Sequence, residues 1–321
     1  MLCKKENCIG CGVCKAVCPS DAISFVKFKG FSYPSVDFSI CRTNDTCAGL
    51  CTAACPALSY KISGLSPAMY KAEGDAKGLF ALFAEQVLLR GGAVCAPVML
   101  EDLSVQFHII EDAAQLSAVS VGGALRLFQG DAGDAYLRCR QLLETGRELL
   151  FFAPPCMVAG LKSFLSKNYY TLLTIDSICS GAASLLIYAD YVSSNSAYHE
   201  SVEAKLFSSL LFRESCFSCK YARPQRVGDI TLGNCAEGSL LSVNSVKGVD
   251  SLKAISSELT LGKLDAEQME VLAPRFFSAT ERPPLRDAFF ADYEKHGYLY
   301  VEKKYLRESG LRRFFRGIFK R

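Results

Sequence analysis

Cysteines gather in two runs near the start of the chain, and each run ends in a cysteine followed by proline. The two runs are Cys8, Cys11, Cys14 and Cys18-Pro19, then Cys41, Cys47, Cys51 and Cys55-Pro56. In Cys-x2-Cys-x2-Cys, three thiolates leave one tight loop toward the same iron–sulfur cluster, while the cysteine before proline binds a second cluster. The chemistry that this spacing favours is therefore the ligation of a pair of 4Fe-4S clusters and the transfer of single electrons.

The same rule assigns each cysteine to one cluster. We name Cys8, Cys11, Cys14 and Cys55 the cluster I set, and Cys18, Cys41, Cys47 and Cys51 the cluster II set. The second loop is less regular, with five, three and three residues between its cysteines. Zinc and disulfides are the alternatives, but zinc sites favour two separated cysteine pairs and do not explain a Cys-Pro closing both runs. Residues 1–62 thus resemble a small α+β bacterial two-cluster ferredoxin domain, and Cys3 is expected to be a plain thiol.

Four later cysteines form a candidate third site, which we name the third set. Its members are Cys156, Cys179, Cys216 and Cys219. Cys156 follows a predicted strand at 148–153, and Cys179 follows another at 170–178. Open α/β sheets bind ligands beyond the carboxyl ends of their strands, so these two thiols are placed for chemistry. Spacing alone leaves two interpretations open, a further cluster or ordinary buried thiols, and the second is the expectation for Cys95, Cys139 and Cys235.

The elements that must position these cysteines alternate between strands and helices. Strands are predicted at 93–100, 104–110, 148–153 and 170–178, and helices from 78, near 111–116, at 134–145, at 158–165 and from 184. Such alternation is typical of an α/β domain with a largely buried sheet. We expect a ferredoxin domain at 1–62, a linker at 63–77, an α/β domain at 78–285 and a C-terminal helical region at 286–321. A short hairpin around Gly30, which residues 36–40 could extend, should bring the two cysteine runs together.

Composition narrows the function classes. The 321 residues carry 36 basic and 33 acidic side chains, and the net charge of +3 gives no reason to expect a nucleic-acid partner. No apolar run approaches the roughly 18 residues that span a bilayer, and sixteen cysteines without a signal peptide favour the cytoplasm. Residues 311–321 form a basic amphipathic helical pattern. Contact with an anionic membrane surface, and so a membrane-peripheral location, is one interpretation, and packing on the protein body or a partner is the other.

A family resemblance rests on the order and spacing of six segments. They are Gly91-Gly92, Arg126-Leu-Phe-Gln129, Phe152-Ala-Pro-Pro-Cys156, Cys179-Ser-Gly181, the pair Cys216 and Cys219, and Gly228-Asp-Ile-Thr-Leu-Gly233. Together with the ferredoxin unit they resemble the coenzyme F-420 hydrogenase/dehydrogenase beta-subunit family, flavoproteins often fused to an N-terminal ferredoxin domain. The resemblance implies an α/β flavoprotein-like domain that binds FAD. It also implies that the third set holds a third 4Fe-4S cluster near the flavin.

Flavin contacts carried over from the resemblance fall on Arg126 and Gln129. Gly91 and Gly92 could let the backbone approach a cofactor, although a helix stop and turn is the plainer interpretation. The function implied is a flavin-dependent iron–sulfur oxidoreductase that passes electrons between its clusters, FAD and a redox partner protein or soluble carrier, such as a coenzyme F-420-like molecule.

Departures from the family pattern support an alternative. Ala76-Lys77-Gly78 replaces the family's Ser-Gly-Gly, and the chain has no tryptophan where the family has one in Gly-Asp-x-Trp-Gly. The alternative is a non-catalytic electron-transfer subunit that has lost its flavin and docks a partner redox enzyme.

Overall fold

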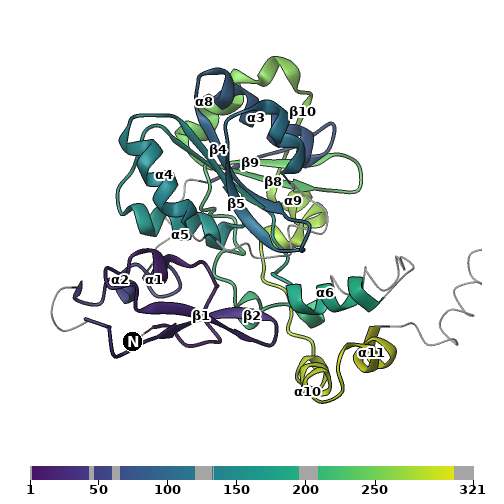
Figure 1. Cartoon of the computed structure of the whole chain (residues 1–321). Coiled ribbons are helices and arrows are strands. Elements are labelled where there is room, and N and C mark those ends of the chain that lie inside the picture. Colours follow the sequence, from purple (N-terminus) through teal and green to yellow (C-terminus); the bar gives the residue numbers. More distant parts are fainter. Residues whose placement is uncertain are drawn as a thin grey trace, which may run out of the picture.

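The computed structural model describes residues 2–42, 47–59, 66–119, 132, 134–194 and 209–306. Arg126, Gln129 and the tail at 311–321 lie outside these ranges. The described chain forms an N-terminal cysteine-rich unit, a large sheet with helices on both faces, and a C-terminal group of helices (Figure 1). None of the described helices is long and apolar enough to cross a bilayer.

The N-terminal unit is built on one antiparallel hairpin. Strands β1 (Ile23–Phe28) and β2 (Phe31–Val36) pair with Phe28 opposite Phe31. The two turn residues between them have φ values of 51° and 74°, which suits the right-handed twist of a two-residue hairpin and explains the glycine at position 30. The predicted hairpin is confirmed, but β2 ends at Val36 and residues 37–40 do not extend it. Two short helices, α1 (Val13–Ala16) and α2 (Leu50–Ala53), pack against each other on this unit.

Within the described residues, one eight-stranded sheet has the order β10-β3-β9-β8-β7-β6-β4-β5. Its strands are β3 (Ala68–Ala72), β4 (Ala93–Met99), β5 (Val105–Ile110), β6 (Leu149–Ala153), β7 (Leu172–Ser177), β8 (Ile230–Asn234), β9 (Ser239–Val243) and β10 (Leu261–Leu264). The four central strands β4, β6, β7 and β8 run parallel, and the outer strands pair antiparallel. Every residue of β6 and β7 is buried, as expected for parallel strands covered on both faces.

Helices cover the two faces of the sheet. One face carries α3 (Ala76–Leu89) and α8 (Val246–Ala254), and the other carries α4 (Ala135–Glu144) and α5 (Pro155–Leu165). Helix α1 of the N-terminal unit packs on α4 and α5, so the cysteine-rich unit lies directly below these helices (Figure 1). The remaining described helical elements of this domain are η2 (Ala113–Ala118), η4 (Ser209–Leu211), η5 (Glu214–Cys216), η6 (Ser256–Glu258), α9 (Ala266–Leu272) and η7 (Pro274–Phe276).

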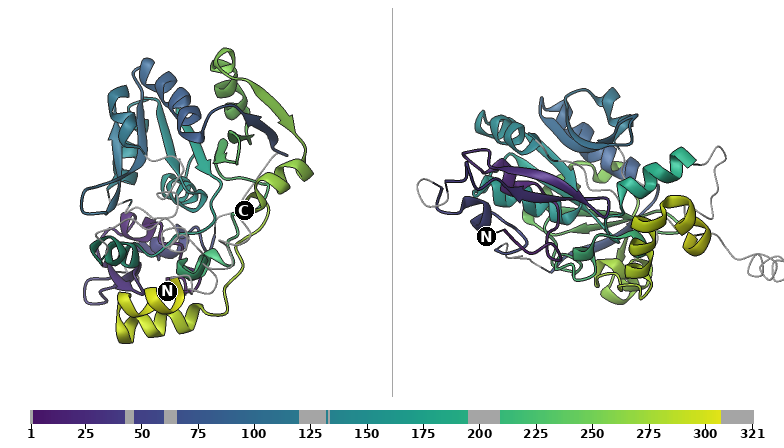
Figure 2. Two further views of the ribbon diagram at one scale, coloured as in Figure 1. Left: turned by 90° about the vertical axis from the view of Figure 1, so that its right-hand side faces the viewer. Right: turned by 60° about the horizontal axis from the view of Figure 1, so that its bottom comes forward.

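The C-terminal group contains α10 (Arg286–His296), α11 (Tyr298–Val301) and a π-helical turn, η8 (Glu302–Leu306). It packs with α6 (Leu185–Ser194) around Phe289 and Phe290. Phe31 of the hairpin joins the same core, so the C-terminal group also contacts the N-terminal unit. Figure 2 shows the described chain from two further sides.

Two predicted boundaries need correction. The predicted linker at 63–77 contains β3, which lies between β9 and β10 in the sheet. Its sequence, Ala-Met-Tyr-Lys-Ala, has no β-branched residue and gives little strand signal, so its partners in the sheet decide its structure. Helix α5 begins at Pro155 rather than at 158, because proline fits the first turn of a helix, where its missing N–H is not needed.

Candidate iron–sulfur centres

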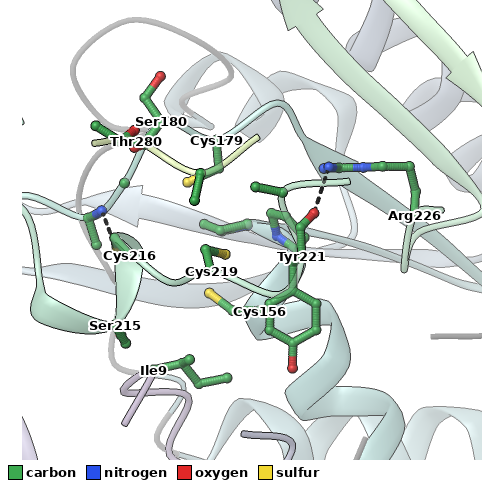
Figure 3. A pocket seen from close by; sticks show the side chains of 16 residues that line it. Ile9, Cys156, Cys179, Ser180, Ser215, Cys216, Cys219, Tyr221, Arg226 and Thr280 are labelled. Carbon is green, nitrogen blue, oxygen red and sulfur yellow. Dashed lines mark hydrogen bonds between the residues drawn. The ribbon is translucent and has the colours of Figure 1, made fainter. Parts of the chain in front are cut away.

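The third set meets at one cavity. All four of its cysteines line one pocket, and in it the side chains of Cys156, Cys179 and Cys219 lie near one another, with Cys216 to one side (Figure 3). Cys156 is the second residue of α5, directly beyond β6, and Cys179 lies two residues beyond β7, the adjacent parallel strand. Cys216 and Cys219 arrive from a loop more than thirty residues later in the chain. The structure thus brings together the four cysteines that the sequence grouped.

The environment of the third set suits thiolates that bind iron. Backbone N–H groups are directed at its sulfurs: Ala182 donates to Cys216 Sγ at 3.3 Å, and Tyr221 and Ala222 donate to Cys219. Burial raises the pKa of Cys216 to about 12 and raises those of Cys156 and Cys219. Burial by itself therefore favours neutral thiols, and the positive charge of iron would be needed to hold them as thiolates. N–H donors to sulfur are one of the means by which proteins set cluster potentials.

The cluster I set lines a second cavity, of about 360 Å³, together with Cys3. A hydrogen bond from the Cys3 thiol, followed by the positive charge of Arg213, lowers the pKa of Cys8 to about 6. Cys3 likewise lowers the pKa of Cys55 to about 6, whereas burial raises the pKa of Cys11 and that of Cys14. The sequence predicts that Cys3 is a plain thiol, and nothing in it indicates the contact of Cys3 with Cys8 and Cys55.

The cluster II set lies around the packed pair α1 and α2. Cys18 follows α1, Cys51 lies in α2, and the backbone N–H of Ala22 donates to Cys18 Sγ at 3.3 Å. Cys51 is near enough to Cys14 to affect its pKa, so the two sets are neighbours. Cys47 is buried, while Cys18, Cys41 and Cys51 are half-buried.

Across the described residues, no three His, Cys, Asp or Glu side chains converge as they would around a metal ion. A cubane makes a different demand. Its four thiolates bind four separate irons at the corners of the cluster, so their sulfurs surround a space rather than a point. Two cavities lined by four or more cysteines meet this demand in the third set and in the cluster I set.

A single segment, residues 213–221, joins the two cavities, and we name it the strap. At its start, Arg213 Nε donates to Cys8 O at 2.6 Å and Ser215 Oγ donates to the same oxygen at 3.0 Å. At its end, Lys220 Nζ and Tyr221 Oη donate to Pro56 O at 2.5 and 3.2 Å. The strap therefore holds both ends of the cluster I set while carrying two cysteines of the third set.

Ile9 lies between the two cavities and lines both of them (Figure 3). On the same side, the loop of Cys11 packs against α5 at Gly160, where an added Cβ would lie 2.6 Å from Tyr136 Oη and 3.1 Å from Cys11 Cβ. Tyr136 Oη donates to Cys11 O at 2.9 Å. The cluster I set and the third set are therefore neighbours, with Ile9 between their cavities and with the Cys11 loop packed against α5.

Gly91 and Gly92, the two predicted flavin contacts within the described residues, lie away from the third set. Gly91 and Gly92 end α3 and turn into the start of β4, at the opposite end of that strand from the cysteines. Gly91 has a φ of 77°, and a Cβ at Gly92 would lie 2.7 Å from Val87 O. Arg147 donates to the carbonyls of both glycines. This packing accounts for the double glycine without a cofactor.

Comparison with known proteins identifies the N-terminal unit. Residues 7–58 match the family described as 4Fe-4S dicluster domain. The chain carries an N-terminal 4Fe-4S dicluster ferredoxin domain. Over 47 residues the chain is 38% identical to an uncharacterized ferredoxin of Methanocaldococcus jannaschii, covering 15% of this chain and 61% of that protein. The match thus spans about three fifths of the relative's length.

The chain also has a likeness among solved structures. The F420-reducing [NiFe] hydrogenase complex from Methanosarcina barkeri contains a chain that is 9% identical, with a TM-score of 0.49. The superposition covers 66% of this chain and 87% of the other.

Proposed function

We propose that this protein is a flavin-dependent iron–sulfur oxidoreductase with three 4Fe-4S clusters, in which the third set holds the last cluster. The observation that carries the proposal is the meeting of Cys156, Cys179, Cys216 and Cys219 at one cavity beside the ferredoxin domain. When bound, the clusters would carry single electrons and FAD would couple them to a two-electron exchange with a soluble carrier or partner.

The order of the electron path follows from neighbouring residues. The cluster II set lies next to the cluster I set through Cys51 and Cys14. The cluster I set lies next to the third set through Ile9. Electrons would therefore pass from the cluster II set, through the cluster I set, to the third set. The hydrogen bonds of the strap and of Tyr136 fix this spacing.

A further cavity, of about 930 Å³, is where we place the flavin in this proposal. Its walls include Gly10 and Gly12 of the Cys11 loop, Val105 at the start of β5, Arg213, and Ala183, which is four residues after Cys179 in the chain. Lys27 adds a positive charge suited to a diphosphate.

The test is the cofactor content of protein purified without oxygen. Three clusters and a flavin predict about twelve irons and one FAD per chain. Replacing Cys156 or Cys179 by serine should remove about four irons and leave the ferredoxin clusters intact. Cys95→Ala is the control, because Cys95 is a buried cysteine that lines neither cysteine cavity, and the iron content of this variant should equal that of the unmodified protein.

Other outcomes separate the possible functions. Twelve irons without flavin would favour the electron-transfer subunit over the flavoenzyme. Eight irons in the unmodified protein, unchanged by Cys156→Ser, would mean that the cysteines of the third set are ordinary thiols of the core that bind no iron. Zinc in place of iron would reject both functions.

A further inference from the structure

Arg213 is one of the most deeply buried charged side chains in the described structure, with 2% of its surface exposed. Its guanidinium donates to Cys8 O at 2.6 Å, to Ser32 O at 2.9 Å and to Cys8 Sγ at 3.5 Å. Its Cζ lies 4.2 Å from the centre of the Tyr33 ring. The hydrogen bonds and the ring fix a positive charge directly beside one ligand of the cluster I set.

The main chain of Arg213 faces the other centre. Its N–H donates to Ala182 O at 2.8 Å, in the loop that follows Cys179, and its carbonyl accepts from the Cys216 N–H at 3.0 Å. One residue therefore holds the loops of two cysteine sets, with its charge on the side of cluster I. The adjacent carboxylate, Glu214, is engaged by Arg282 and Arg286.

The positive charge of Arg213 affects how readily a cluster held by the cluster I set is reduced. Reduction adds one negative charge to a cluster, and burial in a medium of low dielectric constant opposes that addition. A fixed positive charge at hydrogen-bond distance from a ligand sulfur favours the reduced form, and it does so more strongly when solvent does not screen it. Arg213 thus counteracts the effect of burial on the cluster I set. The side chains of the strap donate to the main chain of the ferredoxin domain at Cys8, which is in the cluster I set, and at Pro56, which follows Cys55 of that set.

We propose that Arg213 is a positioning residue that raises the reduction potential of the cluster held by the cluster I set above that of its ferredoxin neighbour. The inference rests on the proposed function only in requiring that both ferredoxin clusters are present. Electrons that enter at the cluster II set then pass to the cluster I set, because the cluster with the higher reduction potential accepts them. The charge of Arg213, and not only its hydrogen bonds, produces the effect.

The experiment is a redox titration followed by electron paramagnetic resonance on the whole chain, after iron and flavin analysis of each variant. Arg213→Gln removes the charge and should lower the equilibrium constant for reduction of cluster I by about tenfold or more. For a one-electron couple this is a fall of about 59 mV in the reduction potential. Arg213→Lys keeps the charge and should recover most of that loss. Lys5→Gln is the matched control, because it removes an exposed positive charge three residues before Cys8 and should leave the potential unchanged.

The unmodified protein supplies a second test, in case Arg213→Gln fails to assemble cluster I. The two ferredoxin signals can be assigned with Cys47→Ser, which alters only the cluster II set. Cluster I must then be the one reduced at the higher potential. The inference is overturned if that order is reversed, or if Arg213→Gln assembles cluster I and titrates as the unmodified protein does. Absence of iron from the unmodified protein would instead reject the proposed function.

Discussion

The contact between α5 and the Cys11 loop yields the sharpest structural prediction. Gly160 lies in the middle of α5, and a methyl group in its place would come within 2.6 Å of Tyr136 Oη and 3.3 Å of Val13 Cγ2. An ordinary contact begins near 3.4 Å, so the tyrosine oxygen must move by about 0.8 Å. Because Tyr136 Oη donates to Cys11 O at 2.9 Å, Gly160→Ala should push the ferredoxin domain away from the helix or break this hydrogen bond.

The expected magnitude combines opposing effects. Overpacking a buried contact costs about 1–3 kcal/mol, and a buried hydroxyl that loses its acceptor costs about 1–3 kcal/mol more. Alanine in place of glycine gains about 1 kcal/mol of helix propensity. The two costs do not add in full, because breaking the hydrogen bond of Tyr136 would relieve the overpacking. We therefore expect Gly160→Ala to lower the free energy of unfolding by about 1–3 kcal/mol. Gly78→Ala in α3 is the matched control, because its new methyl group would meet nothing closer than Asp75 Oδ1 at 3.4 Å and should raise stability by up to about 1 kcal/mol.

Chemical unfolding of the iron-loaded protein measures the stability, and the rate of electron transfer from the ferredoxin clusters to the third centre measures the spacing. Gly160→Ala should lower both, and Gly78→Ala neither. If the two variants are equally stable and transfer electrons at the same rate, then α5 does not set the position of the Cys11 loop, and the reasoning from this contact is wrong.

Three further predictions concern other residues. Cys3→Ala should leave the iron content unchanged, because the cluster I set supplies four thiols without it; a loss of about four irons would make Cys3 a ligand. Arg226→Met should lower the free energy of unfolding by about 3–5 kcal/mol in urea unfolding, because it leaves the fully buried Asp176 carboxylate without its cation at 3.0 Å. Adding Asp176→Asn should recover most of the lost stability, because the buried negative charge is then removed as well. Iron of the third set should be lost as the pH falls, because burial raises the thiol pKa of Cys216 to about 12 and raises those of Cys156 and Cys219, so that assembly of the cluster must release protons; an iron content of the third set that does not change with pH, in site-resolved iron analysis, would contradict this.

Local patterns predicted the α/β class and four of the eight strands of the described large sheet. Period-two and fully apolar runs located β4 to β7, because a strand buried on both faces has a continuous apolar sequence. The same reasoning missed β8, β9 and β10, and also β3, whose short and mixed sequence acquires its structure from β9 and β10. For the segment 111–116 the predicted helix is a 3-10 helix at Ala113–Ala118, a difference of hydrogen-bond pattern that apolar spacing does not distinguish.

The grouping of the third set was predictable in part. Cys156 and Cys179 end adjacent parallel strands, and strand order can be argued from the chain. The approach of Cys216 and Cys219 depends on a long connection, for which the sequence offered only the resemblance of its motifs. The predicted role of Gly91 and Gly92 shows the opposite limit: a double glycine indicates a close backbone contact, and here that contact is with Val87 and Glu148.

The strap had no signal in the sequence, because its contacts join residues far apart in the chain. Arg213 and Cys8 are separated by 205 residues, and Lys220 and Pro56 by 164. Periodicity reports which face of an element is buried, not which distant loop covers it. The strap binds carbonyl oxygens next to Cys8 and Cys55 and carries Cys216 and Cys219 itself, so it cannot move at one cysteine set without moving at the other. Iron binding at the third set should therefore stabilise the ferredoxin loops, and the ferredoxin domain in turn should order the cavity of the third set.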